Sequence, residues 1–235
     1  MKKAGYLLLL LAVLAVGCDG GREREPEVPS EERQTEVAFI GKEEKSTNLL
    51  REYYALLMTT TNQEEVYRFL ETHIQEAEPK DADQLVKGLL NYLADADAAD
   101  YDRLSKQEPY LTVEMQEYIE LMKQEQPETA KLPEMLAWAE KLEKHARTYP
   151  EGVTFLYVYE KFCETVYTVV TEYEEEEATR TCQEFIEANS GTHLAEIMRE
   201  YVDLLENSKG ESEKQLEKYR ANIYSIIKEN FTIEG

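Results

Sequence analysis

The sequence has few glycines and prolines, and few basic residues relative to acidic ones. Ten Gly and seven Pro in 235 residues are too few for short strands joined by many tight turns, so the composition argues against an all-β fold. With 26 Lys and Arg against 49 Asp and Glu, the formal net charge is −23. This charge disfavours binding to nucleic acid or to anionic lipid surfaces. The apolar content of 42% is high enough to predict a folded core.

The sequence also lacks the residue patterns that carry known chemistry. None of the three histidines, His73, His145 and His193, has a second His or Cys three or four residues away, the spacing that metal sites use on helices. His193 and Glu196 have that spacing, but such a lone pair is common by chance. The alternating acids of residues 95–102 lack the Gly and the closing Glu of a calcium loop. We therefore expect no metal site, no catalytic residues, no cofactor and no enzymatic activity.

One apolar run stands at the start of the chain. Two lysines precede the apolar residues 6–16, which a small residue and a cysteine follow. These are the three zones of a secretory signal, and the run is too short for a membrane-spanning helix, which needs roughly 20 residues. Leu14-Ala15-Val16-Gly17-Cys18 resembles the lipobox of bacterial lipoproteins. The resemblance implies that residues 1–17 are a cleaved signal peptide and that Cys18 carries the lipid. A plain signal peptide and an uncleaved anchor are the alternatives.

The lipoprotein resemblance implies a place in the cell envelope. Two acyl chains such as palmitate hold a protein stably on a membrane. The chain would be anchored to the outer face of the cytoplasmic membrane or to the outer membrane. After Cys18, residues 18–45 are acidic, contain Gly and Pro and show little apolar periodicity, so we expect a flexible tether. Residues 46–235 then form the folded domain, with a candidate internal boundary near residues 94–110.

From residue 46 onward, apolar residues recur at three- and four-residue steps, which predicts an all-α domain. Residues 94–110 lack such a stripe and are expected to form a loop or a frayed turn. Connections of two to six residues predict that successive helices are antiparallel. The sequence predicts about nine helices, near residues 47–58, 62–78, 81–93, 112–126, 133–149, 155–170, 178–188, 194–209 and 212–227.

The predicted architecture is an array of antiparallel helical hairpins. Three stretches that begin at Phe69, Leu142 and Phe185 each run from an apolar helix end through a turn into another amphipathic helix. They are similar to the joints of tetratricopeptide-like bacterial lipoproteins. Their starts are 73 and 43 residues apart, whereas the tetratricopeptide period is about 34 residues. Both an irregular bundle and a degenerate repeat solenoid remain open.

Cys163 and Cys182 form a candidate disulfide. They are equally far in sequence from a turn expected near Tyr173. If the two flanking helices pair, both cysteines stand at the same height, within reach of the roughly 5.5–6 Å between Cα atoms that a disulfide needs. An exported protein commonly meets an oxidising environment. The alternative is two small, buried core residues with free thiols.

The function expected from these observations is protein interaction or envelope assembly, without catalysis. The expected partners are the membrane, through the lipid anchor, and a protein, but not nucleic acid. The alternative is a lipoprotein that binds a peptide or glycan through tyrosines, although most of them fall on or next to core stripes, so no ligand-binding residue is assigned. The tyrosines considered are Tyr53, Tyr54, Tyr67, Tyr92, Tyr157, Tyr167 and Tyr224.

Overall fold

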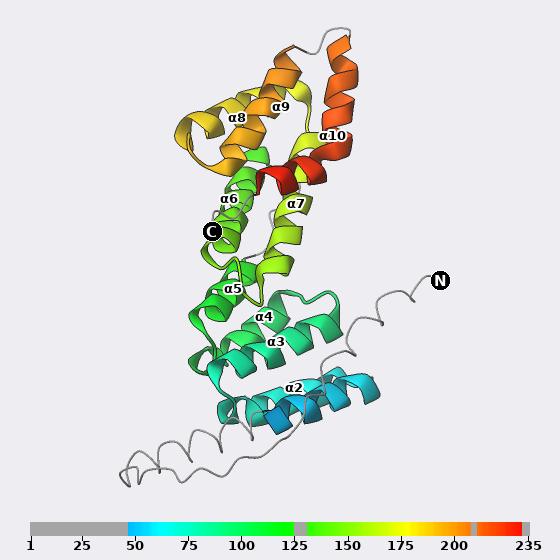
Figure 1. Cartoon of the computed structure of the whole chain (residues 1–235), viewed down its shortest axis with the longest axis vertical. Helices are drawn as coiled ribbons and strands as arrows, with labels where there is room; N and C mark the ends of the chain where they lie inside the picture. Colours follow the sequence, from blue (N-terminus) through cyan, green and yellow to red (C-terminus); the bar gives the residue numbers. More distant parts are fainter. Residues whose placement is uncertain (1–46, 125–130, 208–210, 232–235) are drawn as a thin grey trace, which may run out of the picture. The chain divides into compact units, whose positions relative to one another are not determined.

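The computed structural model describes residues 47–124, 131–207 and 211–231. Within these ranges the chain is α-helical and contains no strand, which confirms the all-α prediction. Residues 1–46, with the predicted signal peptide, Cys18 and tether, lie outside the described residues. Besides helical residues 47–59, the helices are α2 Gln63–His73, α3 Pro79–Leu93, α4 Ala98–Ser105, α5 Val113–Lys123, α6 Leu132–Thr148, α7 Phe155–Thr171, α8 Glu175–Ala188, α9 His193–Glu206 and α10 Glu211–Asn230 (Figure 1), with 3₁₀ turns η1 Ile74–Glu76 and η2 Glu108–Tyr110.

Neighbouring helices pack as hairpins, as expected. The pairs are α2 with α3, α4 with α5, α6 with α7 and α8 with α9, while α10 packs against α7 and α9. The first helices of the pairs, and then α10, begin at residues 63, 98, 132, 175 and 211, which are 35, 34, 43 and 36 residues apart. Three of these four intervals are close to the period of about 34 residues of tetratricopeptide repeats, whereas the interval from α6 to α8 is longer. No helix in the described ranges is both long and apolar enough to span a membrane.

The stretch 94–110, expected to be a loop or a frayed turn, contains α4 and η2. The side chain of Asp97 accepts hydrogen bonds from the backbone N–H groups of Ala99 and Asp100, and the Asp100 carboxylate accepts one from the backbone of Asp97. This reciprocal capping box starts the helix. Only Tyr101 and Leu104 of α4 are buried, which is too few to produce a periodic apolar stripe. The apolar pattern therefore did not predict α4, which is stabilised by its capping box and by the burial of Tyr101 and Leu104.

Pro79 begins a helix, although the sequence suggested that it ends one. α2 stops at His73 and η1 follows it, so the predicted helix 62–78 is shorter than expected. Pro79 is the first residue of α3, a position where its missing N–H costs nothing. The preceding Glu78 is extended, with ψ at 152°, as the ring of a following proline requires. The helix predicted near residues 81–93 therefore begins two residues earlier, with Glu78 as its N-cap.

Three acidic side chains join helices of different hairpins. Each carboxylate accepts backbone N–H bonds at the start of a later helix, at N···O distances of 2.8–3.2 Å. These helix starts are those of α5, α7 and α9, the second members of their pairs. The bonds satisfy donors that a helix start leaves open, and the helix dipole favours the negative charge. The pairs are Asp83 with Thr112, Glu114 with Thr154, and Glu143 with His193 and Leu194.

Candidate ligand-binding cleft

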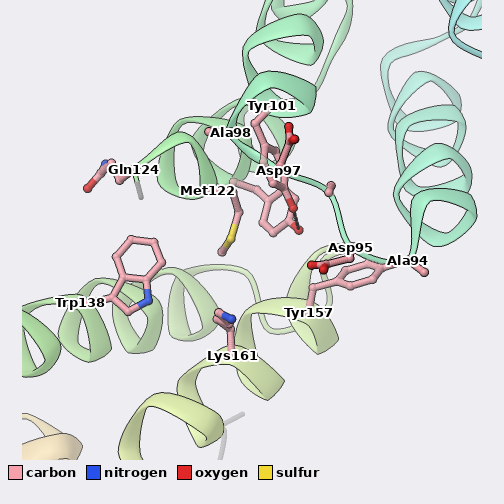
Figure 2. A pocket seen from close by; sticks show the side chains of 12 residues that line it. Ala94, Asp95, Asp97, Ala98, Tyr101, Met122, Gln124, Trp138, Tyr157 and Lys161 are labelled. Carbon is pink, nitrogen blue, oxygen red and sulfur yellow. Dashed lines mark hydrogen bonds between the residues drawn. The ribbon is translucent and has the colours of Figure 1, made fainter. Parts of the chain in front are cut away.

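A cleft of about 550 Å³ opens between two consecutive hairpins, α4–α5 and α6–α7 (Figure 2). This volume lies within the range of about 300–1,000 Å³ found for ligand sites. The turn that joins α3 to α4 forms one side of it. Its lining residues are Ala94, Asp95, Ala96, Asp97, Ala98, Tyr101, Tyr118, Met122, Gln124, Trp138, Tyr157 and Lys161.

Three tyrosines form an aromatic wall of the cleft. Tyr101 and Tyr118 pack edge to face, with ring centroids 6.0 Å apart and hydroxyls 3.2 Å apart. The rings of Tyr118 and Tyr157 are 6.3 Å apart, and the Tyr157 hydroxyl donates to Oδ1 of Asn91 at 2.6 Å. Burial raises the pKa of all three phenols, so they are neutral near pH 7. The bond between Tyr101 and Tyr118 uses one of their two hydroxyl hydrogens, which leaves the other for a ligand.

The indole N–H of Trp138 is a buried donor that lacks a hydrogen-bond partner. Trp138, on α6, is 3% exposed, and its Nε1 is one of four such groups in the described residues. The other three, on Tyr53, Tyr173 and His193, do not belong to the cleft lining. A buried donor without an acceptor costs about 1–3 kcal/mol. Figure 2 shows the indole nitrogen on the edge of the ring that faces Lys161, so an acceptor in the cleft would remove this cost.

Charged side chains of both signs line the cleft. Lys161 lies one turn after Tyr157 on α7, and its Nζ is 3.5 Å from Oε2 of Glu164. Asp95 and Asp97 come from the turn before α4, and both are exposed. The cleft therefore offers an ammonium donor and carboxylate acceptors from different elements.

The turn that carries the two aspartates depends on a strained alanine. Ala94 caps the C-terminus of α3 with φ at 62°, and it is the one non-glycine residue with positive φ among residues 47–124, 131–207 and 211–231. Its N–H donates to the carbonyl of Leu90 at 3.1 Å. A side chain disfavours this left-handed conformation. Such strain gathers at binding sites, where the surrounding structure holds it.

A buried relay behind Tyr118 fixes α5, α6 and α7 to one another. The Thr154 hydroxyl donates to Glu114 at 2.7 Å, so Nε2 of His145, 3.1 Å from the same hydroxyl, must be the donor in their bond. Burial lowers the pKa of His145, whose ring lies 6.2 Å from that of Tyr118. A Cβ on Gly152 would overlap the Glu114 carboxylate. Glycine is therefore required there for the carboxylate to reach Thr154.

The cleft contains one of the seven tyrosines singled out from the sequence. Tyr157 lines it, Tyr53 and Tyr67 are buried in the core, and Tyr92 is half-buried. The remaining three, Tyr54, Tyr167 and Tyr224, are exposed elsewhere. Sequence reasoning missed the cleft residues Tyr101, Tyr118, Met122, Trp138 and Lys161. The one available signal was the single tryptophan of the chain, beside a core stripe.

Cys163 and Cys182 are both free and buried, so the structure lacks the candidate disulfide. The prediction required α7 and α8 to pair, but α7 packs against α6 and α10, whereas α8 packs against α9. Cys182 therefore faces Met198 of α9, with 3.8 Å between the sulfur atoms. Cys163 contacts Tyr159 on its own helix.

The histidines make local contacts. Nδ1 of His73 lies 3.3 Å from Glu76, and Nδ1 of His193 lies 3.4 Å from Glu196. In the part of the chain that the structure describes, no group of three His, Cys, Asp or Glu side chains is placed to hold a metal ion.

Comparison with known proteins gives the chain no relative. No protein-family model, no curated protein and no solved structure matches it. A function for the chain is therefore inferred from its own residues and from the geometry of the cleft.

Proposed function

We propose that the chain is a lipid-anchored binding protein of the bacterial envelope, without enzymatic activity, and that the cleft holds its ligand. The observation that carries the proposal is the partnerless indole N–H of Trp138 at a cleft with three tyrosines. Apolar walls with a few convergent polar groups are characteristic of ligand sites. The anchor rests on the lipobox-like residues 14–18. This geometry favours ligand binding over the expected role in assembly.

Because Trp138 is the only tryptophan, the indole fluorescence of the protein reports directly on the cleft. Titration with libraries of short peptides and oligosaccharides should give a saturable change in emission. Tyr157→Ala should weaken that binding by about tenfold, because an aromatic contact is lost. Tyr167→Ala is the matched control, since Tyr167 lies on the same helix, is 41% exposed and does not line the cleft. If no compound changes the emission or the melting temperature, the cleft is not a binding site.

The anchor is tested separately. Cys18→Ser should abolish incorporation of a labelled fatty acid and release the protein from the membrane fraction, because the sulfur is the proposed attachment point. The wild-type chain grown in parallel is the control. Lipid label retained by the variant would refute attachment at Cys18, whatever the cleft binds.

Protein interaction is the second candidate function, and an exposed aromatic pair supports it. Tyr167 of α7 and Tyr224 of α10 are 41% and 48% exposed, with ring centroids 5.7 Å apart. Exposed tyrosines are common anchors of protein interfaces. Crosslinking in the native host should capture a partner that the double variant Tyr167→Ala, Tyr224→Ala loses. Capture of the same proteins by both forms would exclude this pair as the interface.

A further inference from the structure

The cleft separates donors from acceptors. Trp138 on α6 and Lys161 on α7 provide an N–H and an ammonium group, whereas Asp95 and Asp97 provide carboxylates from the turn before α4. A neutral ligand such as a sugar gains little from opposed charges. A zwitterion gains at both ends, because each of its poles meets a group of opposite charge.

The donor side fits a carboxylate. Nε1 of Trp138 has no partner. The Glu164 carboxylate beside Lys161 is 60% exposed and 3.5 Å away, and such solvated pairs are weak. A ligand carboxylate would accept a neutral bond from the indole and a stronger, charge-assisted bond from the lysine. Met122 also lines the cleft, and its flexible side chain can shift to admit the carboxylate.

The acceptor side fits an ammonium group. The bonds that cap α4 use Oδ1 of Asp97, and Asp95 is exposed at the cleft. The charges of Asp100 and Asp95 add to burial in raising the pKa of Tyr101, so their negative field reaches the tyrosine wall. A cation here would meet carboxylates together with aromatic ring faces, which also attract it.

We propose that the cleft binds a short peptide with free ends, its C-terminal carboxylate on Trp138 and Lys161 and its N-terminal ammonium beside Asp95 and Asp97. The rings of the tyrosines hold the apolar body of the peptide between these poles. The volume of about 550 Å³ limits the ligand to a few residues. This inference rests on the proposed function, because it names the ligand class of the same cleft.

The test uses the full chain in detergent and a tripeptide pool, Ala-X-Ala, in which the middle residue is randomised. The pool is used with free ends, with an amidated C-terminus and with an acetylated N-terminus. The neutral disaccharide diacetylchitobiose is the fourth probe. Trp138 fluorescence and calorimetry measure the affinities. We expect the free-ended pool to bind, and each blocked pool to bind at least about tenfold more weakly, since each lacks one charged contact.

Variants assign each pole of the peptide to its residues. Lys161→Met should weaken binding of the free-ended pool by about tenfold or more, so that this pool no longer binds more tightly than the amidated pool. Asp95→Asn should likewise weaken binding of the free-ended pool, so that it no longer binds more tightly than the acetylated pool. Trp138→Phe keeps an aromatic ring and should cost about tenfold by calorimetry, because the N–H donor is gone. Glu164→Gln is the control on α7, and it should leave binding unchanged or tighter.

The outcomes separate this inference from the proposed function. Equal binding of the free and blocked pools, or binding of the disaccharide in their place, overturns the zwitterion and leaves the cleft as a binding site. If no tripeptide pool binds, the inference is also overturned. The proposed function still holds in that case if any other library compound changes the Trp138 emission. If nothing in the library binds, both fail.

Discussion

At the scale of the residue, the conformation of Ala94 carries a measurable cost. Its φ of 62° places a Cβ where glycine is strongly preferred. Ala94→Gly should therefore raise the free energy of unfolding by about 1 kcal/mol, measured by urea denaturation. Ala99→Gly, on an exposed position of α4, is the matched control and should lower it by about 0.5–1 kcal/mol. If both variants are destabilised alike, Ala94 is not strained.

His145 makes stability sensitive to mild acid. Burial lowers its folded-state pKa, and the charges of Glu114 and Glu117 oppose this effect. A group with a lowered pKa stabilises the fold above its unfolded pKa of about 6.5, and this contribution is lost as the pH falls through the folded value. The free energy of unfolding should therefore fall as the pH drops below about 6.5.

His145→Gln is the variant that isolates this effect, since glutamine can still donate to Thr154 but does not titrate. It should show a flatter pH profile in urea denaturation across the same range. His73→Gln makes the same substitution at a more exposed histidine near Glu76 and is the control for a general effect of replacing histidine by glutamine. Identical profiles for His145→Gln and the wild type would assign the acid sensitivity to other groups.

The two core thiols should be unreactive in the folded protein. Burial raises the pKa of Cys163 to about 11 and that of Cys182 to about 12, and the thiolate is the reactive form. In Cys18→Ser, which leaves these two as the only cysteines, iodoacetamide should react slowly near pH 8 and faster as the pH rises. In urea without reductant, both thiols should be alkylated, as judged by intact mass. An unalkylated product there would reveal a disulfide.

At the scale of the element, Glu143 of α6 holds the start of α9. Its side chain is 5% exposed and accepts from the backbone of His193 and Leu194 and from Nε of Arg147. Glu143→Ala leaves three donors without their acceptor. It should lower the free energy of unfolding, measured by urea denaturation, by about 2–4 kcal/mol. Glu134→Ala changes an exposed residue of the same helix and should cost less than about 0.5 kcal/mol. Equal losses would show that the capping bonds contribute little.

The apolar periodicity of the sequence predicted the helices that bury a whole face, but it did not predict the short α4, which buries two residues. The helices α5 to α10 lie close to their predicted ranges because each of them carries a repeated apolar stripe, and Thr112 caps α5. The short α4 is held by its cap and two buried residues. Because α4 was not predicted, the hairpin of α4 and α5 was not recognised. The interval of 73 residues between Phe69 in α2 and Leu142 in α6 therefore spans two helix pairs. That error hid the helix-pair period.

At the scale of the whole molecule, the cleft could not be located from the sequence. Its residues come from positions 94 to 161 and from two hairpins, so the site exists only once these hairpins pack. The missing partner of Trp138 is likewise a property of the packed structure, because it depends on which acceptors lie nearby. The sequence did suggest tyrosines as binding residues, and of the seven considered Tyr157 lines the cleft.

The acidic character of the chain should limit its stability through repulsion between like charges. A net charge of −23 opposes compaction, and salt screens exposed charges over about 10 Å at 0.1 M and about 3 Å at 1 M. The free energy of unfolding in urea should therefore rise as sodium chloride is added. Glu52, Glu160 and Glu200 are exposed, and changing all three to Lys would reduce the net charge from −23 to −17. This triple variant should be more stable at low salt and gain less from added salt, whereas equal salt slopes would show that repulsion does not limit the fold.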